Sequence, residues 1–318
     1  MPSSAVDFRF WIYFNVIVLV LVFLDMGIFQ RKAHTMKMKE AALWSAFWIA
    51  LALCFNAFVW AQFGPSKGQE FLLGWVMEKS LSVDNLFVFV LIFNYFKVPL
   101  EYQRRVLSFG IMGALVMRAV FIWMGALLLQ KFHWMDLVFG GFLVFTGVKM
   151  MRSDDEELDP AGNPVVKLFR RFFPVSETFA EHRFFVVEAG RRLATPLLLV
   201  LLVVESSDVI FAVDSIPAIF GVTTDPFIVY TSNVCAILGL RALYFLLAGA
   251  LTQFRFLKLG ISVVLVFIGA KMLFGDESLP VHWKIDPTIS LVVVGSILAF
   301  AVLGSIMIPV REEKRDEP

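Results

Sequence analysis

One hydrophobic segment constrains the fold of this chain more than any other, because it is apolar enough to cross a bilayer and still contains three carboxylates. Residues 197–220 read LLLVLLVVESSDVIFAVDSIPAIF and include Glu205, Asp208 and Asp214. A carboxylate at the bilayer centre costs about 2.5–3.5 kcal/mol on insertion scales, so each one has to face a protein interior, a water-filled cavity or a cation. The segment therefore predicts a functional site inside the membrane.

The composition predicts a polytopic membrane protein of the all-α class, with the lipid bilayer as its expected surroundings. Of 318 residues, 59% are hydrophobic and only 17% are charged, whereas soluble domains contain about 25% charged residues. The formal net charge of +1 gives no electrostatic reason to expect a nucleic-acid partner. The two cysteines stand singly in apolar runs, so paired thiol chemistry is not expected.

Nine apolar runs of about 20 residues are each predicted to form a transmembrane helix. They cover residues 10–29, 42–63, 71–96, 106–129, 134–151, 195–220, 227–251, 257–274 and 287–308. The first run is too long for the core of a signal peptide and is predicted to be a retained helix. The one long hydrophilic break, residues 152–194, is predicted to contain a β-hairpin over residues 184–193.

Basic residues alternate between the predicted loops. The bases of the first, third, fifth and seventh loops and of the tail include Arg31, Lys32, Lys37, Lys39, Lys97, Arg104, Arg105, Lys167, Arg170, Arg171, Arg183, Arg191, Arg192, Arg255, Lys258, Arg311, Lys314 and Arg315. The loops between them carry a single lysine or no base. By the positive-inside rule, the N-terminus is predicted outside and the C-terminus in the cytoplasm.

Two segments resemble copies of one unit. Residues 78–85 and 208–215 both read as an acid, five residues and then Val-Asp-Asn or Val-Asp-Ser. Further matches follow in the same order, with Arg118-Ala119 against Arg241-Ala242 and residues 145–150 (FTGVKM) against 267–272 (FIGAKM). Helices three to five and six to eight are therefore predicted to be repeats of opposite orientation. Inverted repeats around a midplane site are a recurring plan of secondary transporters.

The repeats predict five regions along the chain. Residues 1–70 form an N-terminal two-helix region, 71–151 the first repeat, 152–194 a cytoplasmic loop, 195–275 the second repeat, and 276–318 the ninth helix and tail.

The intramembrane polar residues offer oxygen ligands for a metal ion. The candidate ligands are Glu78, Asp84, Asn85, Glu205, Asp208 and Asp214. No histidine falls inside a predicted span. Oxygen sites of this kind suit hard divalent cations such as Mg²⁺, Ca²⁺ and Mn²⁺, whereas Zn²⁺ and Cu²⁺ usually recruit imidazole or thiolate. The ligand set does not choose among the hard cations.

Pro217 is predicted to break the sixth helix, because a proline cannot donate a hydrogen bond to the carbonyl of Val213. An unbroken helix would spread its carboxylates over about half of the circumference, whereas a break would gather them.

Arg118 and Arg241 lie near the middle of predicted spans and are predicted to be charge partners of the carboxylates. In one interpretation, acids and bases simply neutralise each other as structural ion pairs. In the other, the arginines hold the carboxylates when no cation is bound and release them when a cation enters. For Lys79, the sequence is compatible with two orientations of the side chain: inward, beside Glu78, or outward, snorkelling toward the membrane surface.

Small residues in the spans are predicted to permit close helix packing. These glycines are Gly110, Gly113, Gly125, Gly140, Gly141 and Gly147.

The motifs EKSLSVDN at residues 78–85, DVIFAVDSIPAIF at 208–220 and TTDPF at 223–227 resemble the TerC family of bacterial integral membrane proteins. The likeness runs from HTMKMK at residues 34–39 to Lys271-Met272 and is strongest to the Alx branch. It implies an inner-membrane protein associated with Mn²⁺ export, with alkaline-responsive expression and with tellurite resistance. It also implies that the family's acidic motifs fall on the six candidate ligands.

Two functions are compatible with these features. The first is a secondary transporter, not an enzyme, that exports Mn²⁺ and is coupled to proton entry. Neighbouring carboxylates disfavour joint ionisation, so one cluster can serve both ions. The alternative is a membrane-bound redox modulator or a scaffold linked to tellurite or alkaline stress. Because the sequence shows no histidine pair in a span and no cysteine pair, no organic cofactor is expected.

Overall fold

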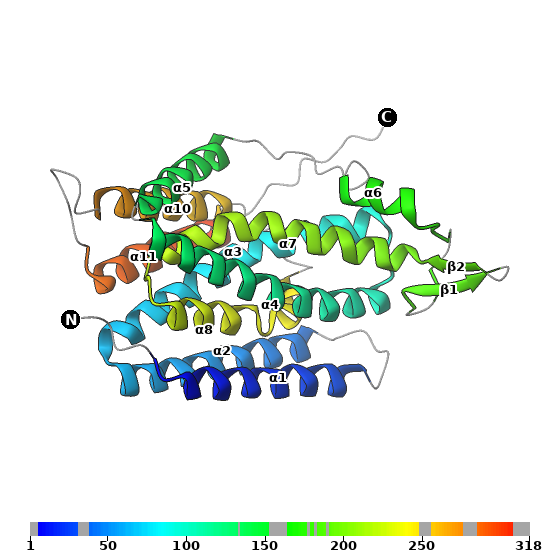
Figure 1. Cartoon of the computed structure of the whole chain (residues 1–318), viewed down its shortest axis with the longest axis horizontal. Coiled ribbons are helices and arrows are strands. Elements are labelled where there is room, and N and C mark those ends of the chain that lie inside the picture. The colour runs from blue at the N-terminus through cyan, green and yellow to red at the C-terminus, as the bar shows by residue number, and fades with distance from the viewer. Residues whose placement is uncertain are drawn as a thin grey trace.

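The computed structural model describes residues 6–30, 38–132, 134–152, 164–176, 179–180, 183–188, 191–247, 256–275 and 285–307. These residues form a helical bundle with a small hairpin at one end (Figure 1). The elements are α1 (Phe8–Gln30), α2 (Met38–Phe63), α3 (Pro65–Tyr95), α4 (Leu100–Lys131), α5 (Met135–Arg152), α6 (Pro164–Phe172), β1 (Phe185–Glu188), β2 (Arg191–Ala194), α7 (Pro196–Phe220), α8 (Pro226–Ile237), α9 (Leu240–Leu247), α10 (Leu257–Gly275) and α11 (Pro287–Met307).

The all-α membrane architecture is confirmed. Judged by helix length and composition alone, the described helices include fewer than nine candidate membrane spans. In the described part of the chain, α1, α2, α4, α7, α10 and α11 are long and apolar enough to cross a membrane, with mean hydropathies from 1.9 to 2.5. The α8–α9 pair is a seventh candidate, bent by 44°. Helices α3 and α5 do not qualify because each brings several charged residues into its apolar stretch. The count of nine stays a prediction.

The helices pack in an order that places the carboxylate-bearing segments at the centre. Helices α1 and α2 lie together along one side of the bundle, α5 and α10 lie on the other, and α3, α4, α7 and α8 lie between them (Figure 1). The α1–α2 layer is joined to α8 by aromatic contacts, with the ring centroid of Phe14 5.1 Å from that of Phe55 and 6.4 Å from that of Phe227.

Helices α5 and α10 meet through backbone contacts made possible by glycine. A Cβ atom on Gly140 would lie 2.9 Å from the carbonyl oxygen of Gly269, and one on Gly147 would lie 2.7 Å from the carbonyl oxygen of Ser262. When residues 145–150 are aligned on 267–272, these two contacts interchange. Such an exchange is what a twofold relation between the repeats requires, so the packing supports the inverted repeat as a prediction.

The predicted helix break at Pro217 is wrong. Helix α7 continues through Pro217 to Phe220, and the amide of Gly221 donates to the carbonyl oxygen of Pro217 over 3.0 Å. A proline in the last helical turn removes a hydrogen bond to one carbonyl without ending the helix. The observed break lies in the next span, between α8 and α9, where Gly239 takes a φ of +83° that favours glycine.

The predicted hairpin in the long hydrophilic segment is confirmed, and the cytoplasmic position of that segment stays a prediction. One further helix in the segment was not predicted. Strand β1 pairs with β2 in antiparallel register, with Val186 opposite Leu193. The short helix α6 precedes the hairpin and packs against α7 through the buried side chain of Val166.

Several sequence predictions lie outside the residues that the structure describes. They concern the basic residues Arg31, Lys32, Lys37, Arg255, Arg311, Lys314 and Arg315.

Replacing Gly140 with alanine is expected to lower the free energy of unfolding by about 1–3 kcal/mol, because the new methyl group overlaps the backbone of α10. Gly141 is the matched control, since a Cβ there meets nothing within 4 Å; Gly141→Ala is expected to change stability by no more than about 0.5 kcal/mol. SDS-induced unfolding of the full chain in mixed micelles measures both. Equal effects at the two positions would contradict the described α5–α10 contact.

Candidate intramembrane cation site

A buried ion-pair cluster centred on Arg118 of α4 joins four helices. The guanidinium pairs with the carboxylate of Glu78 on α3 and donates to the side-chain oxygen of Asn233 on α8 over 2.8 Å. Its other terminal nitrogen lies 3.7 Å from a carboxylate oxygen of Asp208 on α7. Arg118 and Glu78 are each only 1% exposed. The structure therefore gathers two of the predicted ligands through an arginine and not through a helix break.

Helical spacing explains why these side chains face inward. On α3, Glu78 and Asn85 are seven residues apart and both are buried, as are Asp208 and Ser215 on α7. Residues seven apart on an α-helix are separated by about 20° around its axis, so each pair shares a face. The Asp84 and Asp214 side chains, two further predicted ligands, lie outside the described side chains.

Several buried oxygens in this region have no hydrogen-bond partner within the described structure. They are Glu78 Oε2, Ser82 Oγ, Asp208 Oδ2 and Ser215 Oγ. A buried acceptor without a partner costs about 1–3 kcal/mol, and more when it is charged. Carboxylate and hydroxyl oxygens are the ligand type that hard cations accept. Among the described side chains, no three His, Cys, Asp or Glu residues gather closely enough to form a metal-binding group.

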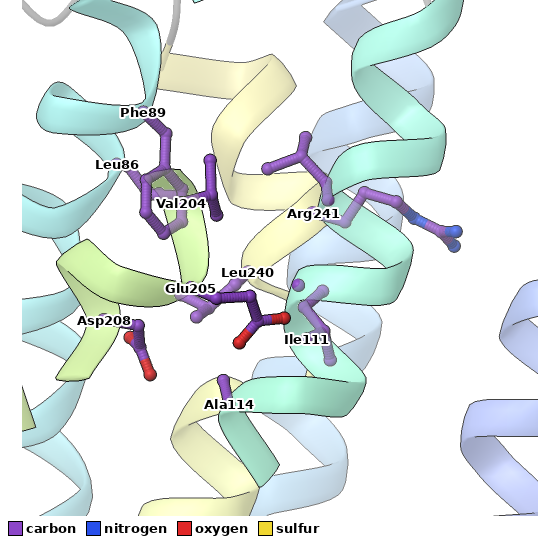
Figure 2. A pocket seen from close by; sticks show the side chains of 11 residues that line it. Leu86, Phe89, Ile111, Ala114, Val204, Glu205, Asp208, Leu240 and Arg241 are labelled. Atoms are coloured by element: carbon purple, nitrogen blue, oxygen red, sulfur yellow. The ribbon is translucent and has the colours of Figure 1, made fainter. Parts of the chain in front are cut away.

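A small pocket with a cavity volume of about 20 Å³ lies beside the cluster (Figure 2). Two predicted ligands, Glu205 and Asp208, contribute the carboxylates of its wall. The other lining residues are Leu86, Phe89, Leu107, Gly110, Ile111, Ala114, Val204, Leu240 and Arg241. These residues come from the earlier parts of α4 and α7, the later part of α3 and the start of α9. The pocket therefore lies toward the end of the bundle that carries α6 and the hairpin.

Glu205 is the half-buried carboxylate of the pocket, and it forms no hydrogen bond or ion pair with any residue that the structure describes. Its carboxylate lies in the notch left by Gly113 of α4, where a Cβ atom would overlap it. Figure 2 shows the Glu205 carboxylate turned toward α4, between Ile111 and Ala114. The predicted role of Gly113 in close packing is thus confirmed, and the packing leaves Glu205 available to a ligand.

Arg241 makes a different contact from the one predicted for it. Its guanidinium donates to a carboxylate oxygen of Asp25 on α1 over 2.5 Å and to the hydroxyl of Ser108 on α4 over 3.0 Å. No sequence motif pointed to Asp25, although a lone acid inside the first apolar run was a usable signal.

Lys79 faces the protein interior and not the lipid. Its ammonium group donates to the carbonyl oxygens of Ala236, over 2.9 Å, and Leu238, over 3.4 Å. These carbonyls lie at the break between α8 and α9, where the regular helical bonding stops. The lysine therefore satisfies carbonyls that would otherwise be exposed at membrane depth.

Comparisons with known proteins agree with the membrane architecture. Residues 63–313 match the family described as "Integral membrane protein TerC family". The "Uncharacterized membrane protein STKORF319" of Myxococcus xanthus is 51% identical over 297 residues, which cover 93% of this chain and 92% of the relative. The "Putative membrane-bound redox modulator Alx" of Escherichia coli (strain K12) is 46% identical over 314 residues, 96% of each chain. No solved structure matches the chain.

Double-mutant cycles are expected to show that Arg118, and not Arg241, is energetically coupled to Asp208. Asp208→Asn with Arg118→Gln should show a coupling of about 0.5–3 kcal/mol in the free energy of unfolding, because the two side chains share one cluster. Asp208→Asn with Arg241→Gln should be additive within about 0.5 kcal/mol, because Arg241 pairs with Asp25. A larger coupling for the second pair than for the first would contradict the described contacts.

Proposed function

The chain belongs to the TerC family of integral membrane proteins, and from this premise we propose that it is a transporter, not an enzyme, that exports Mn²⁺ across the bacterial inner membrane in exchange for protons. The resemblance found in the sequence motifs is thereby confirmed at the level of the family. The exported ion, the coupling to protons and the orientation with the N-terminus outside are parts of the proposal.

One observation carries the proposal: carboxylate oxygens without partners lie inside the bundle, next to a pocket. Glu78 Oε2 and Asp208 Oδ2 are buried without a hydrogen bond in the described structure, and Glu205 opens into the pocket. A bound divalent cation would satisfy these oxygens and offset the cost of burying them. Mn²⁺ accepts an all-oxygen ligand set of this kind.

The geometry of Arg118 suggests how a cation enters the cluster. Arg118 contacts Glu78 and Asn233 closely, whereas its contact with Asp208 is longer, at 3.7 Å. Asp208 is therefore the carboxylate that can turn toward a cation while Arg118 stays anchored on its other two partners. A divalent cation between Asp208 and Glu205 would repel the guanidinium of Arg118 and weaken the contact between Arg118 and Asp208. This repulsion links occupancy to the packing of α4 against α7.

Protons can take the place of the cation in the same cluster. Like charges held close together disfavour joint ionisation. When the metal leaves, uptake of a proton removes part of the repulsion between Glu205 and Asp208. A single cluster can in this way alternate between the exported metal and the entering proton.

The packing of the helices supports alternating access around this cluster. Helix α3 packs against α8 as α4 packs against α7, and these contacts interchange under the predicted repeat. In the proposed orientation, the pocket lies toward the cytoplasm, since it is near the end of the bundle that carries the basic hairpin. An exporter loads its ion from that side.

The alternative function, a membrane-bound redox modulator, is favoured by the name of the Alx relatives. The two cysteines of this chain are both free, with Cys54 exposed on α2 and Cys235 buried on α8. An absorbance spectrum and a metal analysis of the purified chain distinguish the two proposals. A bound chromophore would favour redox chemistry, and bound manganese without a chromophore would favour transport.

Mn²⁺ flux into proteoliposomes tests the transport proposal. Glu205→Gln is expected to lower flux driven by a pH gradient at least about tenfold, because it removes the negative charge that a cation needs in a low-dielectric site. Glu101→Gln is the matched control, since Glu101 is an exposed acid in the first turn of α4, and it should retain wild-type flux. Asp208→Asn should behave like Glu205→Gln. Absence of flux in the folded wild-type chain would overturn the proposal.

A further inference from the structure

We propose that Asp25 of α1 is a positioning residue that holds Arg241 away from the carboxylates of the pocket, so that the first helix takes part in cation binding. This inference rests on the proposed function, because it assigns α1 a role at the same cation site. Asp25 lies before residue 63, where the match to the family begins. In the sequence it stands as a lone acid inside the first apolar run, and no motif links it to the site.

The contacts of Arg241 show a side chain restrained at several points. One terminal nitrogen lies 2.5 Å from Asp25 Oδ1 and 3.4 Å from the Asp25 carbonyl oxygen, and the other donates to Ser108 Oγ over 3.0 Å. The Arg241 side chain is 5% exposed and the Asp25 side chain 18%. A buried guanidinium has to keep an anionic partner, so Asp25 fixes where the positive charge lies.

The restraint turns Arg241 out of a pocket that it also lines. Arg241, Glu205 and Asp208 belong to one pocket wall. Figure 2 shows the guanidinium of Arg241 extending away from Glu205 and Asp208, past α4. Of the residues that line this pocket, Arg241 is the one base. It is therefore the group in the wall that could compete with a cation for the two carboxylates.

The predicted repeat shows what an arginine at this position does without such a restraint. Arg118-Ala119 in the first repeat corresponds to Arg241-Ala242 in the second. Arg118 contacts the intramembrane carboxylates Glu78 and Asp208 directly. Arg241 would have the equivalent choice, but α1 lies outside both repeats and supplies Asp25 in place of a site carboxylate. Asp25 thus makes the two halves of the bundle unequal.

Removing Asp25 should convert Arg241 into a competitor of the metal. A released guanidinium will seek Glu205 or Asp208, since a buried charge without a partner is strongly unfavourable. If the released arginine occupies the carboxylates nine-tenths of the time, the apparent affinity for the cation falls about tenfold. Deleting the arginine as well removes the competitor, so the affinity should return.

Equilibrium binding of ⁵⁴Mn²⁺ to the purified full chain tests this inference. Asp25→Asn is expected to raise the Kd about tenfold, and the double variant Asp25→Asn with Arg241→Gln should return to within about twofold of wild type. Asp25→Glu keeps the carboxylate and should restore tight binding. The matched control is Asn15→Ala, which removes a 2.6 Å hydrogen bond from Tyr230 to α1 without touching Arg241, and its Kd should equal that of wild type.

The outcomes are distinguishable. An unchanged Kd in folded Asp25→Asn, or a double variant as weak as Asp25→Asn, would overturn the positioning role while wild-type binding keeps the proposed function intact. Absence of binding by the folded wild-type chain would overturn both proposals. If Asp25→Asn does not fold, Arg241→Gln is measured in its place, because an arginine that Asp25 holds away from the carboxylates should leave the Kd unchanged when it is removed. A Kd at least about fivefold below that of wild type would show that Arg241 already competes with the cation while Asp25 is present, and would overturn the inference.

Discussion

The need to neutralise a fully buried guanidinium determines how the centre of this bundle is arranged. Arg118 is surrounded by protein, and its charge is matched by Glu78 with help from Asp208 and Asn233. Those partners come from three other helices, so α3, α7 and α8 all have to approach α4 at one depth. Losing one member of such a cluster leaves the others charged without a partner, which makes the group behave as a unit. The pocket lies beside this fixed point, and Asp208 belongs to both the cluster and the pocket wall.

Much of the fold was predictable, because the signals are local. Apolar runs and a turn between strand-forming residues located the long helices and the β1–β2 hairpin to within six residues, but not α6 or the division between α8 and α9. The break was misplaced because a proline is conspicuous in sequence, yet Pro217 lies where a helix is ending anyway. The observed break lies at Gly239. The carbonyls of Ala236 and Leu238 beside it accept hydrogen bonds from Lys79, which is 157 and 159 residues away in sequence. A long-range contact of that kind leaves no mark in the local pattern.

In the candidate site too, some features were predictable from the sequence and others were not. The high cost of burying a charge pointed correctly to Glu78, Asp208 and Arg118 as interior groups. That cost does not say which acid meets which base, and symmetry between the two motifs suggested equal roles for the two arginines. In the structure, Arg241 forms an ion pair with Asp25. Residues 216 positions apart meet because α1 packs along the bundle, which only the tertiary arrangement can show.

The lysine at the α8–α9 bend has a consequence for the empty protein. Unwound carbonyls at membrane depth are commonly where a transporter recruits a dissolved ion, and such a bend then depends on the ion for its shape. Here the chain brings its own tethered ammonium to that position. The bend is thus built in and does not depend on cargo. In the proposed transport cycle, the α8–α9 bend therefore has the same internal support when no ion is bound as when the site is occupied.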